Sequence, residues 1–215
     1  MKFAIIESMW GIPRSTKRWW LNLRNAPCSG EAGRQTRYVH CYDDEVTRAV
    51  VVGNGGGGKS TLSRALAERH NLSWCSIDQI QWTPGWEPAP DQDVVERIRS
   101  VMASDRWIID GWGPWSSLGE RMDRSDTLIF VDLPLWMHFW LAAERQIAIA
   151  QGQPRSDPVD GCDDLLITRR LFETIWHVDQ NLKPQLIELV EQYAPGREYH
   201  HVTTLEQLDR LATAG

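Results

Sequence analysis

The stretch "VVVGNGGGGKSTLS", residues 50–63, decides how this chain of 215 residues folds. Three valines, typical of a buried strand, precede five glycines within six positions, and Lys59, Ser60 and Thr61 follow at once. The segment that begins at Gly53 fits the pattern G-x-x-x-x-G-K-[ST], which joins a strand to a helix. Glycines let successive N–H groups point at phosphate oxygens without Cβ clashes, and the helix N-terminus adds a favourable dipole. The stretch therefore predicts a site for a nucleoside triphosphate.

The side chains of this glycine-rich loop have separate expected tasks. Lys59 would reach the β- and γ-phosphates, and Ser60 would give a hydroxyl to Mg²⁺, with Thr61 beside it. ATP and Mg²⁺ are the predicted cofactors. A glycine-rich turn that binds nothing is the alternative, but strand, spacing, lysine and serine together argue against it. The residues predicted to hold the nucleotide are Gly53, Gly55, Gly56, Gly57, Gly58, Lys59, Ser60 and Thr61.

Outside this loop, short apolar runs alternate with longer segments of helical periodicity, which is typical of βαβ units and a mostly parallel sheet. We therefore expect an α/β protein. The predicted strands are 48–53, 73–78, 106–110, 126–132 and 198–203. The predicted helices are 59–70, 91–104, 134–150, 164–181, 184–194 and 204–213. Residues 151–163 are dense in Gly, Pro and Asp, which predicts a loop or flap able to close over a ligand.

Charge is unevenly distributed along the chain. The formal net charge is −6, but residues 1–48 sum to +3 and residues 49–215 to −9. We expect an N-terminal extension, residues 1–48, ahead of one domain, residues 49–215. The acidic body argues against a general nucleic-acid binder. In the extension, residues 3–6 could add an edge strand, and the basic segment "STKRWWLNLR" (residues 15–24) could touch nucleic acid or an anionic membrane. A loosely packed extension is the other interpretation.

Cysteine usage and hydropathy indicate a cytoplasmic protein. The four cysteines are scattered, with no C-x-x-C pair, so reduced thiols are the simplest interpretation. No export signal is visible at the N-terminus. The most apolar stretch, residues 127–143, is interrupted by Asp132, Pro134 and His138, so it fails as a membrane span. The oligomeric state stays open.

Three predicted strands end in an acid, namely Asp78, Asp110 and Asp132. In an open parallel sheet the ligand lies beyond the carboxyl ends of the strands. An acid at that position can hold Mg²⁺ through water, or it can accept the proton of an acceptor hydroxyl. The alternative for any one of them is a helix cap or a turn residue.

Three further segments carry a family resemblance. They are "SIDQIQWTPGW" (76–86), "DRWIIDGW" (105–112) and "RSDTLIFVDLPLWMHFW" (124–140). With the glycine-rich loop, their order over residues 49–213 resembles the small P-loop kinases described as adenylate kinase-related or DNA topology modulation proteins. The resemblance implies a nucleoside-monophosphate-kinase-like fold of five parallel strands flanked by helices, with the P-loop strand central. Proteins similar to this chain carry several arginines in the flap, where this chain has Arg145 and Arg155.

The resemblance also implies roles for single residues. Asp78 is the better candidate for orienting or deprotonating an acceptor hydroxyl, and Asp110 for holding Mg²⁺ together with Ser60, although the two acids could exchange roles. Arg145, on the helix that leads to the flap, is the first cation expected to neutralise charge on the transferring phosphoryl group. Arg155 is the second.

Tryptophan is unusually frequent, with twelve copies. Several fall in the loops after the second and third predicted strands, beside the expected acceptor site, namely Trp82, Trp86, Trp112 and Trp115. Tryptophan offers a flat apolar face and one N–H donor, which suits a planar or sugar-like acceptor. Packing of the loops is the alternative, and the helical Trp136, Trp140 and Trp176 are expected in the core. The predicted substrate residues are Asp78, Trp82, Trp86, Trp112 and Arg121, with Arg124 as a second anchor.

These patterns favour an enzyme that transfers a phosphoryl group from ATP to a hydroxyl or phosphate of a small molecule. A nucleotide, a nucleoside or a nucleoside-like antibiotic would suit the expected pocket. The second hypothesis is an ATP-dependent regulator of a protein or DNA partner, which the basic N-terminal segment supports and the acidic body opposes. A simple ATPase is the third, and it needs a water-positioning residue that the sequence does not reveal.

Overall fold

The computed structural model describes residues 46–155 and 157–213, all within the unit formed by residues 43–215. The expectations for residues 1–45, including the edge-strand alternative and the basic segment, lie outside the described residues. Arg48, the last residue of the expected extension, begins the first strand. In the described part of the chain, no helix combines the length and the apolar character needed to cross a membrane.

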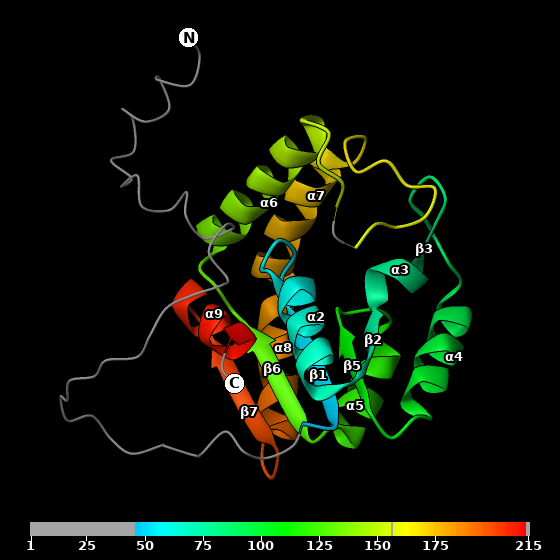
Figure 1. The fold of residues 1–215 in the computed structure, drawn as a ribbon, viewed down its shortest axis with the longest axis vertical. Helices are drawn as coiled ribbons and strands as arrows, with labels where there is room; N and C mark the ends of the chain where they lie inside the picture. Colours follow the sequence, from blue (N-terminus) through cyan, green and yellow to red (C-terminus); the bar gives the residue numbers. More distant parts are fainter. Residues whose placement is uncertain (1–45, 156, 214–215) are drawn as a thin grey trace, which may run out of the picture. The chain divides into compact units, whose positions relative to one another are not determined.

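Five strands form one parallel sheet in the spatial order β2-β5-β1-β6-β7 (Figure 1). They are β1 (Arg48–Gly53), β2 (Ser73–Ser76), β5 (Trp107–Asp110), β6 (Thr127–Val131) and β7 (Glu198–Val202). The five predicted strands and the α/β fold class are therefore confirmed. Strand β2 is shorter than predicted, because a helical turn begins at Ile77.

Helices connect the strands and cover both faces of the sheet (Figure 1). They are α2 (Lys59–His70), α3 (Ile77–Gln81), α4 (Asp91–Met102), α5 (Trp115–Arg124), α6 (Leu135–Ala150), α7 (Thr168–His177), α8 (Lys183–Tyr193) and α9 (Leu205–Thr213). The predicted single helix over 164–181 is wrong: α7 ends at His177, and a π-helical turn, Val178–Leu182, leads into α8.

The sequence analysis misses two elements that flank the candidate site. One is α5, which follows a segment rich in helix breakers, "GWGP" at 111–114. The other is a short antiparallel hairpin of β3 (Trp82–Thr83) and β4 (Glu87–Pro88). Both lie in loops where glycine and proline suggest a turn, and their partners along the chain decide that they are ordered.

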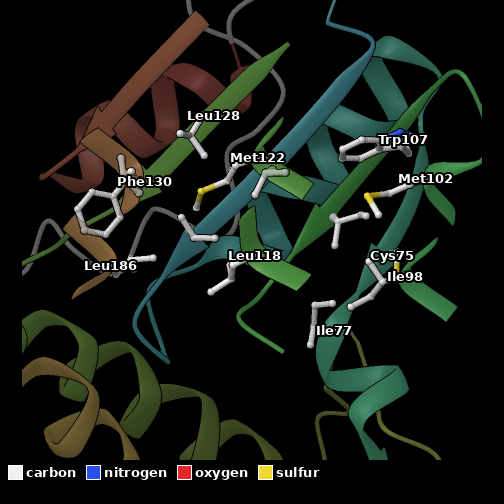
Figure 2. Close-up of a cluster of buried hydrophobic side chains, with 14 of the residues drawn as sticks. Cys75, Ile77, Ile98, Met102, Trp107, Leu118, Met122, Leu128, Phe130 and Leu186 are labelled. Carbon is white, nitrogen blue, oxygen red and sulfur yellow. The ribbon is translucent and has the colours of Figure 1, made fainter. Parts of the chain in front are cut away.

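Strand β1 is buried on both faces, as expected for a central strand of a parallel sheet. Val50 and Val52 belong to a core cluster with α4, α5 and α8, part of which Figure 2 shows. Ala49 and Val51 point to the opposite face and belong to a cluster with α2 and α9. The strand that leads into the glycine-rich loop is therefore held between two packed layers, which gives that loop a rigid base.

Three tryptophans expected in the core are on the surface instead. Trp136 and Trp140 on α6 are 62% and 40% exposed, and Trp176 on α7 is 55% exposed. The prediction for these residues is wrong because helical spacing alone does not say which face of a helix is covered. On α6 the buried positions are taken by His138, Ala142 and Gln146.

Candidate functional site

The glycine-rich loop, residues 53–58, runs from the end of β1 to the start of α2, and close packing explains its unusual glycine content. A Cβ added to Gly56 would lie 2.6 Å from the carbonyl oxygen of His138, and one added to Gly57 would lie 2.8 Å from the same residue's Cε1. A Cβ on Gly53 would lie 2.1 Å from the carbonyl oxygen of Val131. Helix α6 and strand β6 therefore press against the outer side of the loop, and only glycine fits.

Two helices also hold the loop by hydrogen bonds. The Asn54 side chain donates to the carbonyl oxygen of Ile175 on α7 at 2.8 Å and accepts from the Gly55 amide at 2.7 Å. On α6, His138 Nδ1 lies 2.8 Å from the Gly55 carbonyl oxygen. Burial, with the nearby charge of Lys59, lowers the pKa of His138 to about 4. The ring is therefore neutral at pH 7, and its Nδ1 carries the proton because a carbonyl can only accept.

The predicted metal pair, Ser60 and Asp110, is brought together by the fold. The Ser60 hydroxyl donates to Asp110 Oδ1 at 3.0 Å, and Trp74 Nε1 donates to Oδ2 at 2.6 Å. Asp110 is 3% exposed, and this burial raises its pKa to about 6 in spite of both hydrogen bonds and the charge of Lys59. A buried carboxylate of this kind is stabilised by any cation that approaches its oxygens.

Lys59 lies at the same site. Its Nζ donates to the carbonyl oxygen of Asn54 at 2.7 Å, within the loop that it follows. Burial lowers the pKa of Lys59, and the charges of Asp110 and Asp78 oppose that shift. The glycine-rich loop, the lysine and the serine–aspartate pair therefore converge, as their spacing in the sequence predicts.

Arg155 of the flap is an ion-pair centre. Its guanidinium is 5% exposed and lies 3.1 Å from Asp78, 3.0 Å from Asp157 and 3.2 Å from Asp164. Burial lowers its pKa, but the hydrogen bonds with Asp157 and the surrounding carboxylates raise it more, so the net shift is upward. In this structure Arg155 holds the flap against Asp78.

Arg145 lies on α6 near the same carboxylates. Its Nε is buried without a hydrogen-bond partner among the described residues. Burial and the like charge of Arg155 lower its pKa, while the charges of Asp157, Asp78 and Asp164 oppose the shift. A buried, incompletely bonded guanidinium beside Lys59 suits the binding of an anion.

The flap is also tied to the β3–β4 hairpin. The Gly85 amide donates to the Gly161 carbonyl oxygen at 3.0 Å, and the indole N–H of Trp86 donates to the Asp163 carbonyl oxygen at 2.9 Å. Trp86 is 7% exposed, so the flap uses the ring that the sequence analysis gives to the acceptor. Trp82 keeps more exposure and lies edge-on to Trp86, with 5.9 Å between ring centroids.

Two other predicted substrate residues support the loop after β5. Trp112 Nε1 donates to the Gly53 carbonyl oxygen at 2.6 Å, which joins this loop to the glycine-rich loop. Arg121 is fully buried, and its guanidinium donates to the carbonyl oxygens of Gly111 and Trp112. These contacts favour a structural role for Arg121 over the predicted substrate anchor.

The third strand-end acid has other partners. Asp132 pairs with Lys183 at 2.6 Å and lies 3.1 Å from His201 Nε2. Asp78, in contrast, accepts hydrogen bonds from Arg155 and from Gln81, and its side chain is 45% exposed. Of the three acids, Asp78 and Asp110 therefore lie at the glycine-rich loop with groups suited to phosphate chemistry.

Several site residues have no recognisable signal in the sequence. His138, Trp74, Asp157 and Asp164 each sit in a segment whose pattern indicates only a helix, a strand or a loop. Their contacts with the site join positions far apart in the chain, so local spacing cannot reveal them. In the described residues, no group of three or more His, Cys, Asp or Glu is arranged to hold a metal ion.

The sheet order, the parallel strands and the glycine-rich loop after the central strand together define a nucleoside-monophosphate-kinase-like P-loop fold. Two solved structures are similar to the chain. One is a "putative kinase" from Chloroflexus aurantiacus, with 18% identity, a TM-score of 0.40, and coverage of 77% of this chain and 95% of that chain. The other is shikimate kinase from Acinetobacter baumannii in complex with shikimate, with 15% identity, a TM-score of 0.45, and coverage of 78% and 89%. No protein-family model and no curated protein matches the sequence.

Proposed function

We propose that this protein is an ATP-dependent phosphotransferase that acts on a small-molecule acceptor. The observation that carries the proposal is the Ser60 hydroxyl bonded to the buried Asp110 carboxylate at 3.0 Å, directly after a glycine-rich loop and Lys59. A glycine turn without a ligand has no need for a buried acid and a buried amine beside it, since burying charged groups is costly.

The donor set at this position fits Mg²⁺. Mg²⁺ prefers hard oxygen ligands and is usually held by one or two carboxylates, phosphate oxygens and water. The Ser60 hydroxyl and the Asp110 carboxylate are two such ligands on one site. When bound with ATP, the ion would supply neutralisation of charge on the phosphates.

The residues of the chain would then divide the work. Backbone amides of the glycine-rich loop orient the phosphates, and Lys59 neutralises the β- and γ-phosphates. Asp78 orients the acceptor hydroxyl and takes its proton as the new P–O bond forms and the bond to the β-phosphate bridging oxygen breaks. Arg145, with its unpartnered Nε, would face the charge of the transferring group. Release of Asp78 from Arg155 precedes that step, so the flap opens first.

The first test is ATP consumption with Mg²⁺, with and without a panel of nucleosides, nucleoside monophosphates and aminoglycoside or nucleoside antibiotics. Phosphorylated product is detected by mass. Acceptor-dependent turnover supports the proposal. Slow hydrolysis that no acceptor changes supports a simple ATPase instead, and tight binding of DNA or protein with such hydrolysis supports a regulator.

The second test is Lys59→Ala. We expect kcat to fall at least about 100-fold, because a positioned charge on the transferring phosphate is lost. Circular dichroism should show the fold retained. Arg169→Gln is the matched control, since Arg169 pairs only at the surface with Glu173 among the ion pairs of the described residues. Normal turnover in folded Lys59→Ala protein contradicts the mechanism.

A further inference from the structure

We propose that the acceptor is an uncharged or cationic alcohol with a flat apolar ring, and that it is not a phosphomonoester. The inference rests on the proposed phosphotransferase function, because it concerns the cavity from which an acceptor would reach Asp78. It narrows the range of substrates that the sequence leaves open.

A cavity of about 280 Å³ lies between the hairpin, the start of α4 and the loop before α5. Rings form much of its wall, since Trp82, Trp115, Pro88 and Pro114 all line it. Trp115 is 40% exposed, so the core does not cover its indole. A cavity of this size takes a small ligand, and indole faces bind flat apolar groups.

The charge of the cavity wall is negative. Asp91, the first residue of α4, is the charged residue among the described residues that line the cavity, and no lysine or arginine is among them. The helix N-terminus favours the ionised form of this carboxylate. Arg170 stacks on Trp82, 5.1 Å from the ring centroid, but does not line the cavity.

This charge opposes a phosphorylated acceptor. A phosphomonoester carries about −1.5 to −2 charges at pH 7. Proteins bind such groups with arginine or lysine, and the cavity wall offers an acid instead. A nucleoside monophosphate would therefore bind worse than its nucleoside, and an amine or an uncharged hydroxyl group would bind better than either.

Gln81 connects this cavity to the proposed reaction centre. Its side chain lines the cavity, and its Nε2 donates to Asp78 Oδ1 at 3.2 Å. The acid proposed to accept the hydroxyl proton therefore lies next to the cavity wall. A molecule held by the rings has its hydroxyl on the same side as Asp78, with Arg155 on the other oxygen of that carboxylate.

The test uses three probes that share one ring and differ in charge. They are tyramine (cationic), 4-hydroxyphenethyl alcohol (uncharged) and 4-hydroxyphenylacetate (anionic), titrated by calorimetry into the full chain with and without Mg-ADP. We expect tyramine to bind at least as well as the alcohol, and the anion to bind roughly fivefold or more weakly, from screened attraction and repulsion by one carboxylate.

Variants assign the charge preference to one residue. Asp91→Asn should bring the three affinities together, while Asp93→Asn, in the same helical turn but outside the cavity wall, should leave their ratios unchanged. Trp115→Ala should weaken all three probes by a similar factor, because it removes ring contact and no charge. Circular dichroism checks that each variant is folded.

The inference is overturned if the anion binds best, if the three probes bind equally, if none binds at millimolar concentration, or if Asp93→Asn changes the ratios as Asp91→Asn does. The proposed function fails separately. In that case Mg-ATP gives no binding heat, whereas the order of the three probes, measured without nucleotide, still reports the charge of the cavity.

Discussion

At the scale of single residues, the glycine-rich loop shows why this chain has more glycine there than the motif demands. The pattern asks for glycine at Gly53 and Gly58 only. Gly56 and Gly57 are needed because α6 packs on the loop from outside, with His138 at the contact. The side chain that forces these glycines also bonds the loop at Gly55. Phosphate binding and helix packing therefore share one set of residues.

Gly57→Ala tests this steric argument. The new methyl group would lie 2.8 Å from His138 Cε1, so we expect a loss of about 1–3 kcal/mol in the free energy of unfolding, as for overpacked cores. Urea unfolding of this variant, of His138→Ala and of the double variant measures the coupling. If the double variant is no more stable than the sum of the two single changes predicts, the clash is not the cause.

The protonation state of His138 predicts a pH dependence. Its pKa in the folded protein, about 4, lies below the unfolded value, so the unfolded chain binds more protons between these values. Stability from the neutral ring is thus present above pH 6.5 and is lost as pH falls toward 4, by about 2–3 kcal/mol. Other acids also titrate in this window, so the wild-type protein is compared with His138→Gln, which retains a donor. Equal losses of stability in both proteins would refute the assignment.

At the scale of elements, the flap is the part that the structure most redefines. The sequence predicts a loop with two arginines that clamp phosphate. In the structure Arg155 is shared by three carboxylates, two of them from the flap itself, and the flap is tied to the hairpin through Trp86. An acidic flap bound to its own arginine closes without a ligand. A change of partner by Arg155, from Asp78 to phosphate, would couple nucleotide binding to flap movement.

Arg155→Gln should therefore open the flap. Removing the shared cation leaves buried carboxylates unpaired, and we expect a local loss of about 3 kcal/mol. Hydrogen exchange in residues 151–167 should quicken, while exchange in β1 stays slow. The surface pair of Arg169 with Glu173 is the control, since exposed pairs contribute little. Unchanged exchange in Arg155→Gln would show that the hairpin contacts alone close the flap.

At the scale of the whole molecule, strand order decides which acids serve the site. Strand β5 pairs directly with β1, so Asp110 meets Ser60 at the end of the central strand. Strand β6 lies on the other side of β1, and its acid, Asp132, is bound by Lys183 at the start of α8. The sheet thus separates a phosphate-facing acid from a structural one, although both follow four apolar residues.

Binding of Mg-ATP should stabilise the whole domain. At a concentration 100 times Kd, the linkage contribution is about 2.7 kcal/mol, which raises Tm by several degrees in a domain of this size. Differential scanning fluorimetry measures the shift, and EDTA should remove most of it. Lys59→Ala protein should show a much smaller shift. A Tm that Mg-ATP leaves unchanged would contradict the proposed site.

Particular elements show how far the sequence could predict this protein. The loop from Gly53 to Ser60, its flanking strand and helix, and the pairing of Ser60 with Asp110 all follow from spacing, because the motif is local and the strand ends are marked by acids. Helix α5, the hairpin and the exposed positions of Trp136 and Trp176 did not follow. Breaker residues hid the first two, and amphipathic spacing does not name the covered face.

The sequence by itself determined the parallel α/β fold and the place of the phosphate loop, since both arise from short-range patterns of apolar residues, glycine and proline. Only the tertiary structure decided which partners the polar side chains take. Asn54 bonds to Ile175 across 121 positions of sequence, and Arg155 reaches Asp78 across 77. Such contacts depend on how packed layers bring distant segments together, and a buried polar group takes whichever partner that packing provides.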